Sequence, residues 1–88
     1  MANSNNYRSI ALAVTTTYGA ASVPANPTRK ALVIFNTSAS AIQFSIDATE
    51  INLITVAAGD HLAWLDGVPQ NQINFKAGSS VNITVLEA

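Results

Sequence analysis

The chain has 88 residues and a mass of 9.2 kDa, which is enough for one small domain. Hydrophobic residues make up 49% of it and charged residues only 10%, a balance that excludes an intrinsically disordered protein. The net charge is −1 with scattered basic residues, and no apolar run reaches the ~20 residues of a membrane helix, so we expect neither nucleic acid nor a membrane as partner. The chain lacks cysteine, so association with other chains is the simplest source of extra stability.

The first residues form a polar segment that is too hydrophilic for a core. Met1 to Tyr7 lacks the basic start and apolar centre of a signal peptide, so we expect synthesis in the cytoplasm. We predict an extended N-terminal arm over residues 1–8 and a single β domain over residues 9–88. The arm either stays disordered or orders along a neighbouring subunit, in which case Tyr7 and Arg8 are its candidate anchors.

The first half of the domain shows the two-residue alternation of strands. Residues 10–17 alternate and predict an extended first strand. The prolines Pro24 and Pro27 then predict an edge or polyproline-like connection. Residues 31–35 are apolar on both faces, so this strand has to be covered on both sides, either by two sheets or by a sheet and a neighbouring subunit.

Alternation continues through the second half. We predict strands over residues 42–47, 51–56 and 61–65, with turns at residues 36–40, 47–50, 57–60 and 66–69. Residues 73–76 and 81–86 predict two last strands, which we expect to form a hairpin. The chain is therefore predicted to be all-β, a small β-sandwich or jelly-roll-like β-barrel of about seven or eight strands.

Residues suited to catalysis are few. The single histidine, His61, follows Asp60, and no motif places a nucleophile or a set of metal ligands around it. We interpret the pair as a solvated turn, and predict no enzyme activity, no cofactor and no metal. Trp64 is assigned to the core rather than to a ligand platform.

The predicted outward positions carry Ser, Thr, Asn, Gln and Ala far more than Lys or Glu. Isolated β domains usually protect their edges and surfaces with charge. Two interpretations stay open. The surface is buried against other chains, because hydroxyls and amides can pair without a large desolvation cost, or it is a harmless property of a small domain.

The segment Asn26-Pro27-Thr28-Arg29-Lys30 runs into the apolar strand Ala31–Phe35 and Asn36, and it resembles small virion proteins of tailed bacteriophages. The Ala58-Gly59 turn and the ending from Ala77 to Glu87 agree with that layout. The resemblance implies a decoration or cement protein: a structural protein on the capsid exterior that bridges major capsid protein subunits, commonly as a homotrimer.

Within that resemblance, the interface candidates are Tyr7, Arg8, Arg29 and Lys30. The planar guanidinium of Arg29 would clamp a carboxylate or carbonyls across a subunit boundary, or else would bind the backbone of its own loop. The alternative function is a carbohydrate-binding β module of a head fibre or tail. Its weakness is that most of the six aromatic residues lie at core positions.

Overall fold

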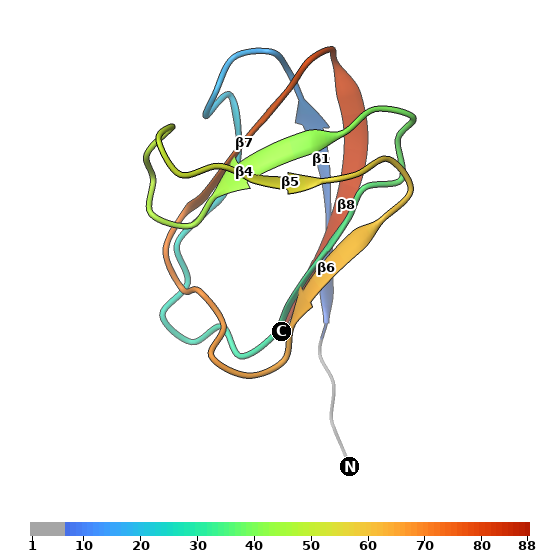
Figure 1. The fold of residues 1–88 in the computed structure, drawn as a ribbon. Helices are drawn as coiled ribbons and strands as arrows, with labels where there is room; N and C mark the ends of the chain where they lie inside the picture. The colour runs from blue at the N-terminus through green and yellow to red at the C-terminus, as the bar shows by residue number, and fades with distance from the viewer. Residues whose placement is uncertain (1–6) are drawn as a thin grey trace.

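The computed structural model describes residues 7–88, and this part of the chain contains eight strands and no helix. In chain order the strands are β1 (Arg8–Val14), β2 (Ala21–Val23), β3 (Leu32–Phe35), β4 (Ile42–Ser45), β5 (Ile54–Val56), β6 (His61–Trp64), β7 (Ile73–Ala77) and β8 (Val81–Glu87). Figure 1 shows them wrapped into one body. The all-β prediction is confirmed.

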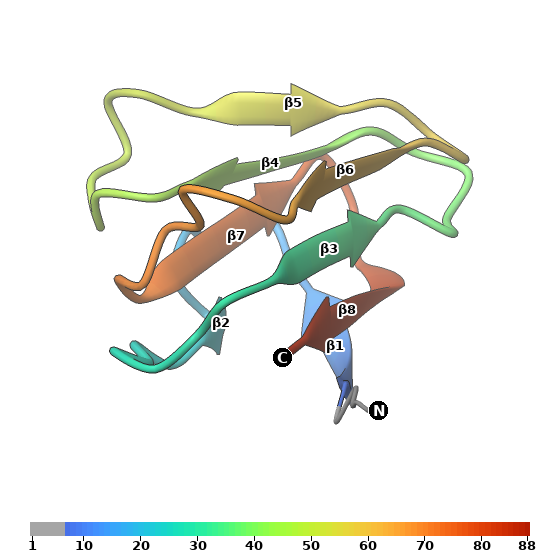
Figure 2. The same ribbon diagram turned by 90° about the horizontal axis from the view of Figure 1, so that it is seen from below.

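The strands form two four-stranded antiparallel sheets. Sheet I has the order β1-β8-β3-β6 and sheet II the order β2-β7-β4-β5. Figure 2 shows them as two layers, with strands of one sheet facing strands of the other. The fold is therefore a small β-sandwich, the first of the two predicted architectures.

The inward positions of both sheets fill the space between the layers. Phe44 and Phe75 of sheet II are fully buried, with ring centroids 5.9 Å apart. Trp64 of sheet I reaches across and meets Phe44 edge-on at 5.7 Å. This geometry is favourable for aromatic pairs and confirms that Trp64 belongs to the core.

The predicted hairpin of the last two strands is wrong. β7 pairs with β2 and β4 in sheet II, whereas β8 lies between β1 and β3 in sheet I. Residues 78–80 therefore carry the chain from one layer to the other. Alternation shows that each strand has one inward face, but two strands of a sandwich can satisfy this either side by side or face to face across the core.

The largest other differences from the prediction are two strand boundaries and one additional strand. β1 ends at Val14, because the carbonyl of Thr15 accepts a hydrogen bond from the Ala77 amide (2.9 Å) and the chain then turns. β5 begins only at Ile54, since the segment before it is a loop in which Ile51 is 86% exposed. The short strand β2 was not predicted, and Pro24 ends it at a sheet edge.

The predicted boundary between arm and domain is one residue too late. Arg8 is the first residue of β1 and pairs with Glu87 of β8, so it belongs to the sandwich. Tyr7 precedes the strand and is 43% exposed. The rest of the predicted arm, residues 1–6, lies outside the described residues.

Candidate functional site

The outer face of sheet I carries no Lys, Arg, Asp or Glu. Strand pairing and the alternation of exposure identify its residues. They are small, apolar or uncharged polar side chains: Ser9, Ala11, Ala13, Val33, Phe35, His61, Ala63, Asn82, Thr84 and Leu86. We call this set the sheet I outer face. Four strands spaced by ~4.8 Å give it a projected area of about 300 Å².

The middle of the sheet I outer face is apolar. Val33 and Phe35 of β3 are each half-buried, and Val33 lies opposite Leu86 on β8. Phe35 also lies 5.7 Å from the imidazole of His61. Among residues 7–88, sheet II covers the inner face of the strand over residues 31–35 and no strand covers its outer face, where Val33 and Phe35 are partly exposed.

The outer face of sheet II is more polar than that of sheet I. Its side chains are hydroxyls, amides and one ion pair, and many are already satisfied within the chain. The hydroxyl of Tyr18 lies 2.5 Å from the Ser45 hydroxyl and accepts a hydrogen bond from the Asn74 amide at 3.3 Å. Lys76 donates to the Glu50 carboxylate at 2.8 Å.

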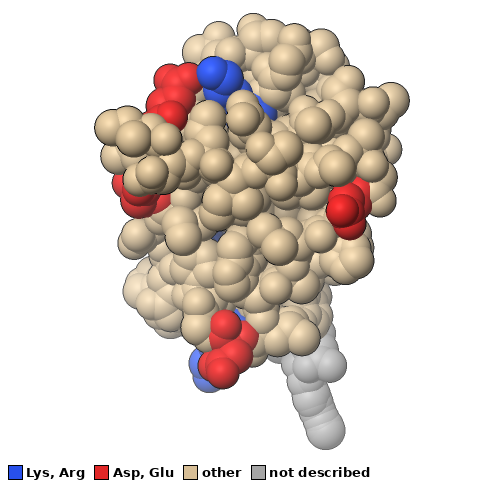
Figure 3. Space-filling model, in the orientation of Figure 1, with Lys and Arg blue, Asp and Glu red and all other residues tan. Residues whose placement is uncertain are grey.

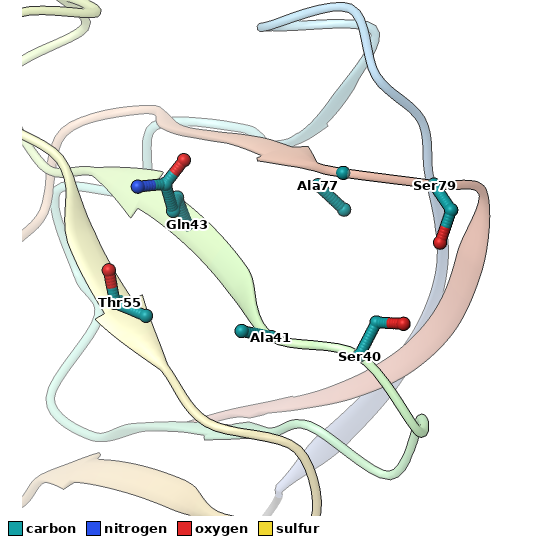
Figure 4. A pocket seen from close by; sticks show the side chains of 7 residues that line it. Ser40, Ala41, Gln43, Thr55, Ala77 and Ser79 are labelled. Atoms are coloured by element: carbon teal, nitrogen blue, oxygen red, sulfur yellow. The ribbon is translucent and has the colours of Figure 1, made fainter.

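A shallow hollow opens beside this sheet, between the ends of β4, β5 and β7 (Figure 4). It is lined by Ser40, Ala41, Gln43, Thr55, Ala77, Gly78 and Ser79. None of these side chains is aromatic or ionisable. The hollow therefore provides neither a stacking surface for a sugar ring nor an acid–base pair.

Charged side chains gather at the ends and loops of the molecule. In the view of Figure 3, Lys, Arg, Asp and Glu lie near the rim, and most of the surface between them is uncharged. Asp60 and Asp66 lie in the loops on either side of β6, and Asp47 and Glu50 lie in the loop after β4. Broad uncharged surfaces bounded by sparse charge are suited to contact with protein.

Arg29 is fully buried inside the domain. Its Nε donates to the Glu87 carboxylate at 2.6 Å. Its terminal nitrogens donate to the carbonyl oxygens of Pro69 (2.6 Å), Asn71 (3.2 Å) and Pro24 (2.7 Å). The interface role predicted for Arg29 is therefore wrong in this structure, and the intramolecular alternative holds, because the guanidinium has no exposed surface to offer a partner.

The Asn-Pro-Thr-Arg segment builds the turn that buries this arginine. The Asn26 side chain accepts hydrogen bonds from the Thr28 amide (3.0 Å) and hydroxyl (2.8 Å), and the Arg29 amide donates to the Asn26 carbonyl. The Gln70 side chain then closes the far side by donating to the Arg29 carbonyl at 3.1 Å. The most recognisable sequence element thus supports the fold.

Glu87 receives two arginines. Arg8 on the neighbouring strand β1 donates to one carboxylate oxygen, while Arg29 binds the other. Burial by itself would raise the pKa of Glu87, but the hydrogen bonds and positive charges of Arg29 and Arg8 outweigh it and hold that pKa below its usual value. Two of the four predicted interface residues are therefore brought together by an acid that the sequence analysis did not single out.

A signal for Glu87 was present in the sequence. It continues the inward phase of Val81, Ile83 and Val85, and an acidic residue in the buried phase of a strand requires a basic partner. Lys30 has an exposed side chain beside this cluster, and its amide donates to the carbonyl of Ala88. Lys30, Tyr7 and the exposed part of Arg8 remain available to a partner.

Asn36 is a second structural residue, although its sequence context predicts only a turn. Its buried amide nitrogen donates to the carbonyls of Ser40 (2.8 Å), Val56 (3.0 Å) and Ala57 (3.2 Å). Its side-chain oxygen accepts from the Ser38 amide and hydroxyl. One side chain therefore ties together the two connections at this end of the sandwich.

The described part of the chain offers no cluster of metal-ligating side chains. Within residues 7–88, no group of three His, Asp or Glu side chains is placed to hold a metal ion. His61 is exposed on β6, and its backbone amide donates to the Asp60 carboxylate at 2.9 Å. Over the same residues, no helix is present that is long and apolar enough to cross a membrane.

Comparison with known proteins does not assign a family. No family model, no curated protein and no solved structure matches this chain.

Proposed function

We propose that this chain is a structural virion protein that decorates the exterior of a tailed-phage capsid and cements neighbouring major capsid protein subunits. It is made in the host cytoplasm and carries out no reaction. The observation that carries the proposal is the sheet I outer face, an uncharged surface with an apolar centre on a rigid two-layer scaffold. Desolvating such a surface costs little, so it suits burial between protein subunits.

The size of this surface favours several weak contacts over one strong contact. About 300 Å² is well below the ~800 Å² that each partner of a stable complex typically buries. A protein that contacts the shell through several copies joined together can still be retained firmly, because the later contacts form at a high effective concentration. The homotrimer implied by the phage resemblance is one such arrangement and a dimer is another, and the mass of the chain in solution distinguishes the two.

Rigidity of the scaffold supports the same role. Arg29 joins three loop carbonyls to Glu87, and at the opposite end Asn36 joins two loop carbonyls to the carbonyl of the last residue of β5. Loops held in this way lose little conformational entropy on binding, and that raises affinity for a given contact area.

The test is co-sedimentation with capsid shells assembled from the major capsid protein of the phage that carries this chain. Val33→Lys places a charge at the centre of the sheet I outer face, and Thr55→Lys places the same charge on the exposed outer face of sheet II. We expect Val33→Lys to weaken shell binding at least about tenfold, equivalent to ~1.4 kcal/mol, and Thr55→Lys to leave it nearly unchanged. Trp64 fluorescence checks that both variants fold.

Two results would contradict the proposal. One is a wild-type chain that does not sediment with the shells. The other is equal binding by the two lysine variants, which would show that the sheet I outer face is not the contact surface.

A further inference from the structure

β1 is an open sheet edge with features that the other edges lack. The four edge strands are β1 and β6 of sheet I and β2 and β5 of sheet II. β1 has seven residues, against three in β2, three in β5 and four in β6. Proteins normally shorten or block such edges, because exposed backbone groups recruit other strands.

Two of the other edges carry such protection, and the third, β5, has only three residues. Pro24 follows β2 directly and cannot donate a backbone hydrogen bond. On β6, the carboxylate of Asp60 occupies the amide of His61 and also places a negative charge at that edge. β1 has no proline, and its only charged residue is Arg8 at its first position.

The pairing of β8 with β3 shows which way its backbone groups point. Ala31 and Ala88 exchange both backbone hydrogen bonds, at 3.0 and 3.1 Å, so they are a hydrogen-bonded pair. Such pairs alternate along an antiparallel ladder, so Thr84 and Leu86 also bond towards β3. Val85 and the other odd-numbered residues of β8 therefore bond towards β1 on the other side.

The same alternation identifies the free groups of β1. Ile10 and Leu12, the partners of Val85 and Ile83, bond to β8, so Ser9, Ala11 and Ala13 direct their N–H and C=O groups to the open edge. Thr15, the next odd-numbered residue, supports this assignment, because its carbonyl points away from β8 and accepts a hydrogen bond from the Ala77 amide. Within the described chain, Ser9, Ala11 and Ala13 have no backbone partner on that side.

We propose that two copies of this chain associate through antiparallel pairing of their β1 edges, with Ala11 facing Ala11 of the second copy across a two-fold axis. This register places Ser9 opposite Ala13, so all three free residues form hydrogen-bonded pairs and about six hydrogen bonds join the two chains. In this symmetric contact each copy pairs all three of its free β1 residues, so association stops at two chains.

Two further properties of β1 suit a second copy as the occupant. Ile10 and Leu12 point to the core but remain half-exposed at the edge, and in this register they cover each other across the axis. The two Arg8 side chains lie at opposite ends of the paired strands, each opposite Val14, about 20 Å apart, so they do not repel each other closely.

The dimer extends the functional surface. Sheet I of one copy continues into sheet I of the other, so the sheet I outer face doubles to about 600 Å², approaching the size of a stable docking surface. The pairing itself does not depend on the capsid role, and it is tested without any shell.

The first measurement is sedimentation equilibrium of the full chain over micromolar to submillimolar concentrations. We expect wild type to approach twice the 9.2 kDa chain mass. Ala11→Lys and Ala11→Glu are each expected to remain at the mass of one chain, because the two substituted residues would face a like charge across the axis. An equimolar mixture of the two variants should return to the mass of two chains.

Ala63→Lys is the matched control, since Ala63 is also an exposed alanine of the sheet I outer face but lies on β6. It should dimerise like wild type. A second readout on unsubstituted protein is amide hydrogen exchange: protection at Ser9, Ala11 and Ala13 should increase with concentration, as only pairing occupies those amides.

Several outcomes would overturn the inference. A wild-type chain that stays at the mass of one chain, or that forms a trimer, contradicts two-fold pairing. A dimer that survives Ala11→Lys, or exchange at Ser9, Ala11 and Ala13 that does not change with concentration, shows that another surface is used. Failure to bind capsid shells would affect only the proposed function.

Discussion

The end of the molecule around Arg29 and the sheet I outer face differ in where their polar groups find partners. Each guanidinium nitrogen of Arg29 has a hydrogen-bond partner inside the chain, and the guanidinium has no exposed surface. The sheet I outer face has no charge, and Val33, Phe35 and Leu86 remain partly exposed. The charged residues that look most suited to binding thus hold the fold, whereas the uncharged surface is available to other chains.

The physical reason for this division is desolvation. A buried arginine is tolerated only when its donors are satisfied, and once satisfied it has nothing left to offer a partner. An alanine or valine on a sheet face needs no partner, so it can be buried later, by assembly, at little cost.

The largest expected effect comes from breaking the Arg29 cluster. Arg29→Met leaves the buried Glu87 carboxylate with only Arg8 and leaves three loop carbonyls without their donor. Removing one partner of a buried ion pair typically costs about 3–5 kcal/mol of unfolding free energy. Urea unfolding followed by Trp64 fluorescence measures this loss.

The double variant Arg29→Met/Glu87→Met serves as the comparison for that experiment. It removes the unpaired carboxylate as well, so it should be more stable than Arg29→Met alone. A single variant within about 1 kcal/mol of wild type would show that the cluster is not the structural centre described here.

Acid should also destabilise the Arg29 cluster, with a loss of unfolding free energy between those of Arg29→Met and Arg8→Ala. The pKa of Glu87 is lower in the folded chain than its ordinary value of 4.5, so the carboxylate stabilises the fold above that value. This contribution is lost as the pH falls from there through the folded pKa. Unfolding free energy measured against pH should therefore decline in that window.

The control for the pH experiment is Glu87→Gln, which cannot ionise. Its stability should decline less over the same pH range than that of wild type. Asp47, whose pKa is lowered by hydrogen bonds from Thr49, contributes a separate decline that Asp47→Asn removes. If Glu87→Gln and wild type lose stability in parallel, Glu87 is not the group responsible.

The smallest effect is expected at Arg8, whose side chain contacts the same carboxylate but is 65% exposed. Exposed ion pairs typically contribute about 0.2–1 kcal/mol, because solvent screens the charges. Arg8→Ala should therefore lower the unfolding free energy by no more than this, measured by the same urea titration. A loss equal to that of Arg29→Met would mean that exposure does not separate the two arginines.

Much of the architecture could be predicted from local pattern. Alternation located β3, β4, β6, β7 and β8 to within a few residues, and it placed the inward side chains correctly. Alternation failed where the fold depends on which strands are neighbours, because the pattern does not identify a strand's neighbours. Residues 51–53 alternate like a strand but form an exposed loop, and nothing in β7 or β8 shows that they belong to different sheets.

Candidate functional residues were harder to predict, because the sequence shows the type of a residue and not its surroundings. Arg29 and Arg8 look equally suited to an interface, yet one is buried and the other is mostly exposed. The free backbone groups of Ser9, Ala11 and Ala13 cannot be recognised from residue type, since any residue has them. The position of β1 at the edge of sheet I leaves them without backbone partners among residues 7–88.

Residue types and their two-residue period were sufficient to determine an all-β chain with little charge, because alternation and composition are local properties. The tertiary structure alone decided which strands are neighbours, which arginine is buried and which edge stays open. These depend on how two sheets stack and on where the chain crosses between them, and long-range packing of this kind is not encoded in any single segment.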